Sequence, residues 1–191
     1  MKLDLYATHK AEYIAPKQPE FVTVGPAQYL AIEGTGAPGE ALFQESVGAL
    51  YAAAYTIKFA SKFAGNDYKV CTLEALYWGD IPKDWHWKLI IRIPEFIGKK
   101  ELKAAQQKLA GKGNPLIDQV TIEKLKEGRC IQLLHVGPYD RVHEAFARMK
   151  AHVEANGLGF RGAHHEIYLN DPRRVKPEKL KTIVRMPVAK A

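Results

Sequence analysis

HHEIYLNDP (His164–Pro172) combines β-forming and aromatic residues with a carboxylate at its centre and an Asn-Asp-Pro turn at its end. The pattern predicts a strand that stops at the turn. Because side chains alternate between the two sides of a strand, Glu166 shares one side with His164 and Tyr168. A carboxylate between an imidazole and a phenol is typical of a paired structural group or of the floor of a site. An ordinary solvated Glu on an edge strand is the other interpretation.

The same plan occurs earlier in the chain, at residues 70–80, where a strand pattern surrounds Glu74 and again ends in a turn with an acid. A similar triplet follows each stretch, Arg92-Ile93-Pro94 in one and Arg185-Met186-Pro187 in the other. The triplets lie 93 residues apart and the two glutamates 92 apart, so these features agree in register to one residue. Since a strand and a long helix also precede each stretch, we predict an α+β fold with a duplicated strand-helix-strand-strand unit.

The chain of 191 residues is long enough for one domain with a sizeable core. We predict a single domain over 1–191, with a first half at about 20–96, a linker at about 97–126 and a second half at about 127–189. An apolar fraction of 47% and a charged fraction of 26% are ordinary for a globular protein. The sequence has no apolar run that could span a bilayer and no signal-peptide core, so we expect a cytoplasmic protein without a membrane partner. Cys71 and Cys130 lie in apolar strand patterns, which favours buried free thiols.

The formal net charge of +7 and the pI near 9.3 make nucleic acid a partner to be weighed. Much of the excess charge lies at 99–112 and 173–181, where the pattern indicates a linker and a turn. No helix-turn-helix, zinc-finger or ribonucleoprotein motif accompanies these lysines and arginines. A solvated surface is therefore the favoured interpretation, and nucleic acid is disfavoured as a partner.

The segment from about Glu40 to Phe63 predicts a long helix with a large apolar or aromatic residue at every fourth position. These positions are Phe43, Val47, Tyr51, Tyr55, Phe59 and Phe63. Such a ridge is typical of core packing against a sheet. Buried tyrosines need a hydrogen-bond partner, however, and a ligand pocket with polar groups supplies one. Tyr51 and Tyr55 are therefore either core residues or ligand contacts.

All three tryptophans, Trp78, Trp85 and Trp87, fall within ten positions of the chain and close to Glu74. Alternation along the strand places Thr72, Glu74 and Trp78 on one side. Indole rings are flat and apolar with a single donor, which suits them to stacking on an aromatic or cationic ligand. We favour a ligand wall over a purely structural core for this cluster.

The second half opens with a strand pattern at Cys130–Val136, and Gly137-Pro138-Tyr139-Asp140 then precedes a helix. We predict that this helix runs to about Asn156 and stops at Gly157. Packing is a sufficient role for its apolar face, which consists of Val142, Phe146, Met149 and Val153.

Four segments together resemble the GyrI-like small-molecule-binding family, in particular its stand-alone bacterial members, over roughly residues 20 to 189. They are Ala54–Phe59, Leu73–Trp78 with Trp85–Trp87, His135–Asp140 and His164–Pro172. The resemblance implies two strand-helix-strand-strand units related by a pseudo-twofold axis, with a ligand cleft between them. It also implies that Glu166 is the acid that faces the ligand.

Some stand-alone members with two glutamates and a tryptophan-rich cleft resemble hydrolases that open the cyclopropane ring of DNA-alkylating natural products. Such a reaction needs a base for water, a donor for the carbonyl oxygen, and flat walls that exclude solvent. Glu166 and Glu74 can act as the base and as a protonated donor, since two carboxyls in one apolar cleft have pKa values driven apart. Tyr55, Tyr168 or His164 can donate to the carbonyl. The other predicted ligand contacts are Trp78, Trp85, Trp87, Tyr51 and Thr72.

The same cleft also fits a module that binds, sequesters or senses cationic or aromatic xenobiotics without chemistry, and both interpretations stay open at this point. The predicted partner is a small aromatic molecule, with no cofactor and no metal ion. A homodimer is compatible with the sequence. Binding to gyrase or another protein has weaker support, since the sequence identifies no exposed apolar patch.

Overall fold

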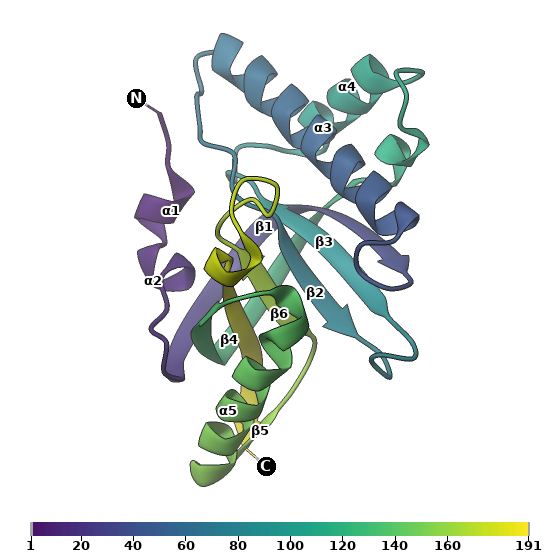
Figure 1. The fold of residues 1–191 in the computed structure, drawn as a ribbon. Helices are drawn as coiled ribbons and strands as arrows, with labels where there is room; N and C mark the ends of the chain where they lie inside the picture. Colours follow the sequence, from purple (N-terminus) through teal and green to yellow (C-terminus); the bar gives the residue numbers. More distant parts are fainter. Residues whose placement is uncertain (1, 191) are drawn as a thin grey trace. The chain divides into compact units, whose positions relative to one another are not determined.

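The computed structural model describes residues 2–190 as a mixture of helices and antiparallel strands (Figure 1). These residues form two compact units. Unit 1 contains the chain up to Thr8 and Ala27–Leu125, and unit 2 contains His9–Pro26 and the chain from Lys126 onward. Two long strands, β1 (Glu20–Thr35) and β4 (Thr121–Val136), each continue from one unit into the other.

Unit 1 is built around β3 (His86–Arg92), which pairs antiparallel with β1 on one side and with β2 (Glu74–Trp78) on the other. Its long helix, α3 (Ala41–Phe63), packs the ring of Phe43 edge-on against Trp87 of β3, with 5.2 Å between ring centroids. The other helical elements of the unit are α1 (Leu5–Thr8), α4 (Lys99–Leu109) and the 3₁₀ helix η1 (Pro115–Gln119).

Unit 2 is built around β7 (Lys181–Lys190), which pairs antiparallel with β4, β6 (His164–Tyr168) and β5 (Leu158–Phe160). The helix α5 (Val142–Ala155) covers one face of these strands and contributes Met149 to an apolar core that also contains Leu133 and Val184. The other helical elements of the unit are α2 (Lys10–Tyr13), η2 (Tyr139–Arg141) and η3 (Pro177–Lys179).

The predicted duplication is confirmed. Unit 1 has the order β1-α3-β2-β3 and unit 2 the order β4-α5-β6-β7, and in each ladder the last strand lies between the other two. Arg92 of β3 pairs with Tyr29 of β1, and Arg185 of β7 pairs with Gln132 of β4. The short strand β5 is outside the predicted repeat.

The two glutamates do not occupy equivalent positions of the repeat. Glu74 pairs with Ile90, whose counterpart 93 residues later is Ile183. Ile183 pairs with Ile167, so the counterpart of Glu74 is Ile167, and Glu166 lies one residue away. Because a shift of one residue along a strand moves a side chain to the other face, the offset of 92 between the glutamates reverses their orientation within the repeat.

The packing of α3 and α5 shows which face of its strand ladder each glutamate occupies. Tyr77 and Trp87 are cross-strand partners on the face that α3 covers, so Glu74, three positions from Tyr77, points to the opposite face. Glu166 is the cross-strand partner of Val184, which belongs to the core under α5. Glu166 therefore points towards the helix of its unit, and Glu74 points away from the helix of its own.

The aromatic ridge of α3 is buried or partly buried only from Phe43 to Tyr51, so its interpretation as a core stripe is wrong for Tyr55, Phe59 and Phe63. The fractional exposure is 48% for Tyr55 and 87% for Phe63. An α-helix has 3.6 residues per turn, so residues spaced by four drift by roughly 40° per step around the axis. The ridge consequently leaves the buried side, which is formed by Phe43, Ser46, Ala49, Leu50, Ala53, Ala54, Ile57 and Ser61.

Most predicted elements occur within a few residues of their expected bounds, but β4 begins at Thr121, nine residues before the strand predicted at Cys130–Val136, and the strand predicted from Val70 is shorter than expected. It begins only at Glu74, because the backbone N–H groups of Thr72 and Leu73 donate to the hydroxyls of Tyr6 and Tyr51 instead of to a neighbouring strand. None of the helices within residues 2–190 has both the length and the apolar character needed to cross a bilayer.

Gly34 of β1 permits close packing in unit 1, since a Cβ at this position would overlap the ring of its cross-strand partner, Trp87. Trp87 is fully buried and cannot move aside cheaply. We expect Gly34→Ala to lower the free energy of unfolding by about 1–3 kcal/mol, as for other overpacked cores. Urea unfolding would measure this loss. Gly25→Ala in the same strand is the matched control, because nothing lies within 4 Å of its added Cβ, and an equal loss in both variants would contradict the packing argument.

Candidate functional site

The candidate site of unit 2 surrounds Glu166 in the middle of β6. Its carboxyl group is nearly enclosed, with 8% of the residue exposed. Nε2 of His164 lies 3.4 Å from Oε1 of Glu166, and the hydroxyl of Tyr168 donates a hydrogen bond to the same side chain. The structure therefore brings His164, Glu166 and Tyr168 together on one side of the strand, as alternation predicts.

Burial sets the protonation of this group. It raises the pKa of Glu166 to about 7, while the hydrogen bond from Tyr168 and the nearby His165 act in the opposite direction. Burial also lowers the pKa of His164 to about 4, and His165 adds to the effect. At neutral pH, His164 is therefore an uncharged imidazole, and Glu166 is about half ionised.

Tyr139, from the turn before α5, closes over this group. Its ring meets that of Tyr168 edge-on, with 5.4 Å between centroids and 74° between planes. Burial, followed by the charge of Glu166, raises the pKa of Tyr139 to about 12, so its phenol stays protonated at neutral pH. Thr182, the cross-strand partner of Tyr168, is fully buried, and its hydroxyl has no hydrogen-bond partner among residues 2–190. Glu166, a buried carboxyl group that can gain or lose its proton near neutral pH, thus lies close to several hydroxyl groups.

The second predicted acid, Glu74, lies in a different group of residues in unit 1. It is fully buried near Cys71, whose pKa is raised to about 12 by burial and by the charge of Glu74, while Arg92 acts in the opposite direction. Two phenols border this segment. Leu73 donates its backbone N–H to the hydroxyl of Tyr51 at 3.2 Å, and Thr72 donates to the hydroxyl of Tyr6.

Of the other residues of unit 1 that were predicted to contact a ligand, some are exposed at the surface and others are buried in the core. Tyr55 is half exposed, with its ring 6.2 Å from that of Tyr51 between centroids. Trp78 is 37% exposed and stacks on His86, while the partly buried Trp85 meets Tyr77 edge-on. Trp87 is enclosed, and its Nε1–H donates to the carbonyl of Gly36 at 3.1 Å. Packing and this hydrogen bond account for Trp87 without a ligand.

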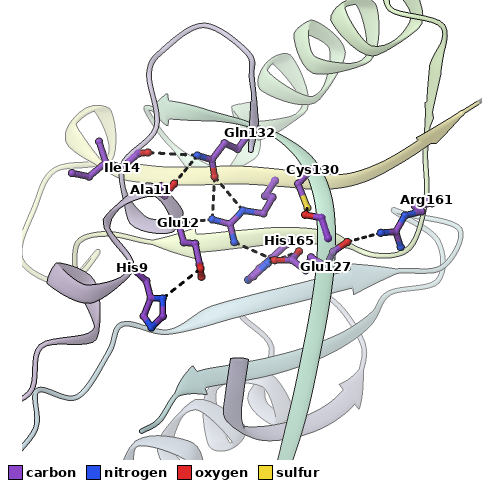
Figure 2. Close-up of polar contacts among 11 residues, drawn as sticks. His9, Ala11, Glu12, Ile14, Glu127, Cys130, Gln132, Arg161 and His165 are labelled. Carbon is purple, nitrogen blue, oxygen red and sulfur yellow. Dashed lines mark hydrogen bonds and ion pairs between the residues drawn. The ribbon is translucent and has the colours of Figure 1, made fainter. Parts of the chain in front are cut away.

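A buried polar network lies on the face of β6 opposite to Glu166 (Figure 2). Arg185 donates from Nη1 to Oε2 of Glu127 at 3.1 Å and from Nε to Oε1 of Gln132 at 3.2 Å. Nδ1 of His165 lies 3.0 Å from Oε1 of Glu127. Arg185 also donates to the carbonyl of Glu12, so the network joins three strands to the N-terminal arm of unit 2.

The network keeps its carboxylate charged. Burial alone raises the pKa of Glu127, but His165 and Arg185 outweigh this effect and hold the pKa at about 2. Glu166 and Glu127 therefore have opposite electrostatic environments within one unit. Of these two carboxyl groups, Glu166 is the one that can change its protonation near neutral pH.

Sequence reasoning missed Tyr6, Tyr139 and the Glu127–Arg185–His165 network. Tyr139 belongs to the Gly137-Pro138-Tyr139-Asp140 turn, which marks the start of a helix but says nothing about the ring packing on β6. Tyr6 lies near the N-terminus, in the part of unit 1 before His9, where the sequence shows no strand or helix periodicity. The sequence carries no signal that this segment contacts residue 72. Each residue acts through a contact with a distant part of the chain.

The family comparison identifies a match over most of the chain. The model of the GyrI-like small molecule binding domain matches residues 17–189. No curated protein matched the chain in sequence.

Three solved structures from Listeria innocua are similar over nearly their whole length. An uncharacterized conserved protein has 35% sequence identity and a TM-score of 0.92, and the match covers 98% of this chain and 100% of that one. A protein described as a hydrolase has 34% identity and a TM-score of 0.90, with 99% and 100% covered. Another structure described as a hydrolase has 35% identity and a TM-score of 0.89, with 98% and 100% covered.

Proposed function

The chain belongs to the GyrI-like family of small-molecule binding domains, and from this membership we propose that it binds flat aromatic xenobiotics and hydrolyses them, with Glu166 as the general base. The observation that carries the proposal is the carboxyl of Glu166, nearly buried, in contact with His164 and Tyr168, and with a pKa raised to about 7. A base of this pKa is half ionised at neutral pH, where general base catalysis is most effective. The hydrolase descriptions of two similar Listeria innocua structures support a hydrolytic reaction.

We propose cyclopropanoid DNA-alkylating compounds as the substrate class, so that the reaction protects the cell. In these compounds a strained three-membered ring is conjugated to a carbonyl group. Water attacks a ring carbon as Glu166 removes its proton, a C–O bond forms and the strained C–C bond breaks. The released electron pair moves through the conjugated system to the carbonyl oxygen, which takes up the proton. The net change is the addition of one water molecule.

Neighbouring groups of unit 2 fit the other needs of this reaction. The phenol of Tyr139 is a donor for the developing charge on the carbonyl oxygen, because the single O–H of Tyr168 already donates to Glu166. The ring of Phe146 packs against His164 at 5.6 Å between centroids, which adds apolar surface. Burial therefore serves catalysis twice, because it raises the basicity of Glu166 and excludes competing water.

A non-catalytic sequestering or sensing module is the second candidate. The family's description as a small-molecule binding domain favours it, and a half-ionised Glu166 also suits a cationic ligand, whose charge would complete the ionisation. The two candidates differ in turnover. Incubation of the protein with a cyclopropanoid alkylator, followed by mass spectrometry, should give ring-opened water adduct in excess of protein. Intact ligand bound in stoichiometric amount would establish the module instead.

The rate of this reaction should depend on pH through Glu166. A general base must be ionised, and the folded-state pKa of about 7 predicts that kcat/KM rises with pH and levels off above about 8. Initial rates of adduct formation between pH 5 and 9 would test this, corrected for the uncatalysed reaction at each pH. A rate that is flat over this range, or that falls as pH rises, would contradict the role of Glu166.

A further inference from the structure

The geometry points to a second ligand site in unit 2, for a small phosphate or phosphate monoester. A cavity of about 240 Å³ lies beside α5, at the edge of β4 and the N-terminal arm. None of its lining residues belongs to the Glu166 group. Leu133 and Ala145 contribute apolar floor, and the charged residues of the wall are Lys17, Arg141, Glu144 and Arg148.

The wall carries three cations against one carboxylate, and each arginine is held in place. Nε of Arg141 lies 2.8 Å from Oε1 of Glu144. Nη2 of Arg148 donates to the carbonyl of Lys17 at 2.7 Å and to Oε1 of Gln18 at 2.9 Å. Three segments, the arm with Lys17, η2 with Arg141 and α5 with Arg148, therefore present positive charge to one hollow.

These contacts leave several donors for a ligand. Within residues 2–190, Nζ of Lys17, both Nη atoms of Arg141, and Nε and Nη1 of Arg148 donate no hydrogen bond. A guanidinium has five N–H donors in a planar fork, so Arg141 retains its Nη1–Nη2 edge, which can hold two oxygens of one anion, while Arg148 retains single donors at Nε and Nη1.

The size and charge of the hollow define the ligand class. Pockets for drug-sized molecules measure roughly 300–1,000 Å³, so this one fits a smaller group. Two guanidinium groups and an ammonium around a small volume suit a dianion with several equivalent oxygens. Phosphate, free or as the end group of a larger molecule, has this chemistry, whereas a flat apolar polycycle does not.

Titration of the full chain with inorganic phosphate would test the site, with ionic strength held constant by NaCl. We expect saturable NMR shifts of the backbone amides of Lys17, Gly137 and Arg148. Lys17→Gln and Arg141→Gln should each weaken the affinity by up to about 5-fold, the range for exposed charge pairs. Lys103→Gln on α4 removes the same charge from another exposed surface and should leave the affinity unchanged. An equal loss in Lys103→Gln, or shifts that never saturate, would overturn the proposal.

A second pair of variants tests the sign of the effect. Glu144→Gln removes the carboxylate of the wall and should strengthen phosphate binding several-fold, while Glu154→Gln at the exposed end of the same helix should not. Tighter binding of glycerol phosphate than of inorganic phosphate would identify an esterified ligand, and equal binding a free phosphate. Acetate binding as tightly as phosphate would overturn the dianion assignment. None of these results depends on hydrolysis at Glu166.

Discussion

Glu166→Gln should lower the rate of water-adduct formation from a cyclopropanoid alkylator by about 100- to 10,000-fold, the range for loss of one positioned base. The amide has the shape of the carboxyl but cannot accept the proton of water. Ligand affinity should stay within a few-fold of wild type, because the apolar contacts are unchanged. Single-turnover kinetics would measure the chemical step, and fluorescence titration the affinity. Loss of affinity with an unchanged chemical step would assign Glu166 to binding alone.

The same variant should be more stable than wild type at alkaline pH. The folded-state pKa of Glu166 lies near 7, above its ordinary value of 4.5, so the ionised form is disfavoured in the fold. Its cost is absent below about pH 4.5, grows as pH rises and is complete above about pH 7. Glu166→Gln removes this cost, worth up to about 3 kcal/mol at 1.36 kcal/mol per pKa unit. Urea unfolding at pH 4 and pH 8 would measure it, with the exposed Glu154→Gln as control.

Arg185→Met should have the largest effect on stability, a loss of about 3–5 kcal/mol at pH 7. Arg185 is almost fully buried, and its removal leaves the carboxylate of Glu127 in the interior without its cation. It also removes the hydrogen bond from Arg185 to the backbone carbonyl of Glu12, and this bond holds the N-terminal arm of unit 2. Urea unfolding would measure the loss. Arg173→Met is the matched control, because Arg173 pairs with Asp171 at the surface and such pairs contribute at most about 1 kcal/mol.

Acid unfolding gives an independent test of this network. The folded-state pKa of Glu127 is about 2, below its ordinary value of 4.5. Its ionised form therefore stabilises the fold above about pH 4.5, and this stabilisation is lost as pH falls towards 2. Stability should decline over this interval in wild type and less steeply in Glu127→Gln. Parallel curves, or a loss below about 1 kcal/mol in Arg185→Met, would show that the network is not a major source of stability.

The sequence predicted the features that depend on local periodicity. Alternation placed His164, Glu166 and Tyr168 on one side of β6, and the apolar spacing of α5 predicted the burial of Met149 and Val153. The repeated Arg-x-Pro triplets predicted the duplication, because they mark the central strand of each unit. The signals for β6 and α5 are each contained within about ten residues, where backbone geometry fixes the outcome, and the duplication is visible because the same short pattern recurs 93 residues later.

Other features depend on contacts that periodicity does not encode. The ridge of α3 follows a spacing of four rather than 3.6, so the pattern misplaced Tyr55 and Phe63 relative to the core. Similarity of composition suggested that Glu74 and Glu166 correspond, but only the pairing of β2 and β6 with their central strands shows the shift of one residue. The pKa of Glu166 is raised by burial under distant parts of the chain, and the pKa of Glu127 is lowered by His165 of β6 and Arg185 of β7.

The shift of one residue between Glu74 and Glu166 has a consequence for the evolution of the two halves. If both halves descend from one ancestral segment, as their common strand order indicates, the two acids cannot be copies of a single ancestral glutamate, because they stand at different positions of the inherited ladder. At least one of them therefore arose after the duplication, on a scaffold that was already doubled. The scaffold was inherited twice, whereas the two acids do not share one origin. Transplanting β6 in place of β2 would therefore not recreate the acid of unit 1, and the two acids are free to diverge in role.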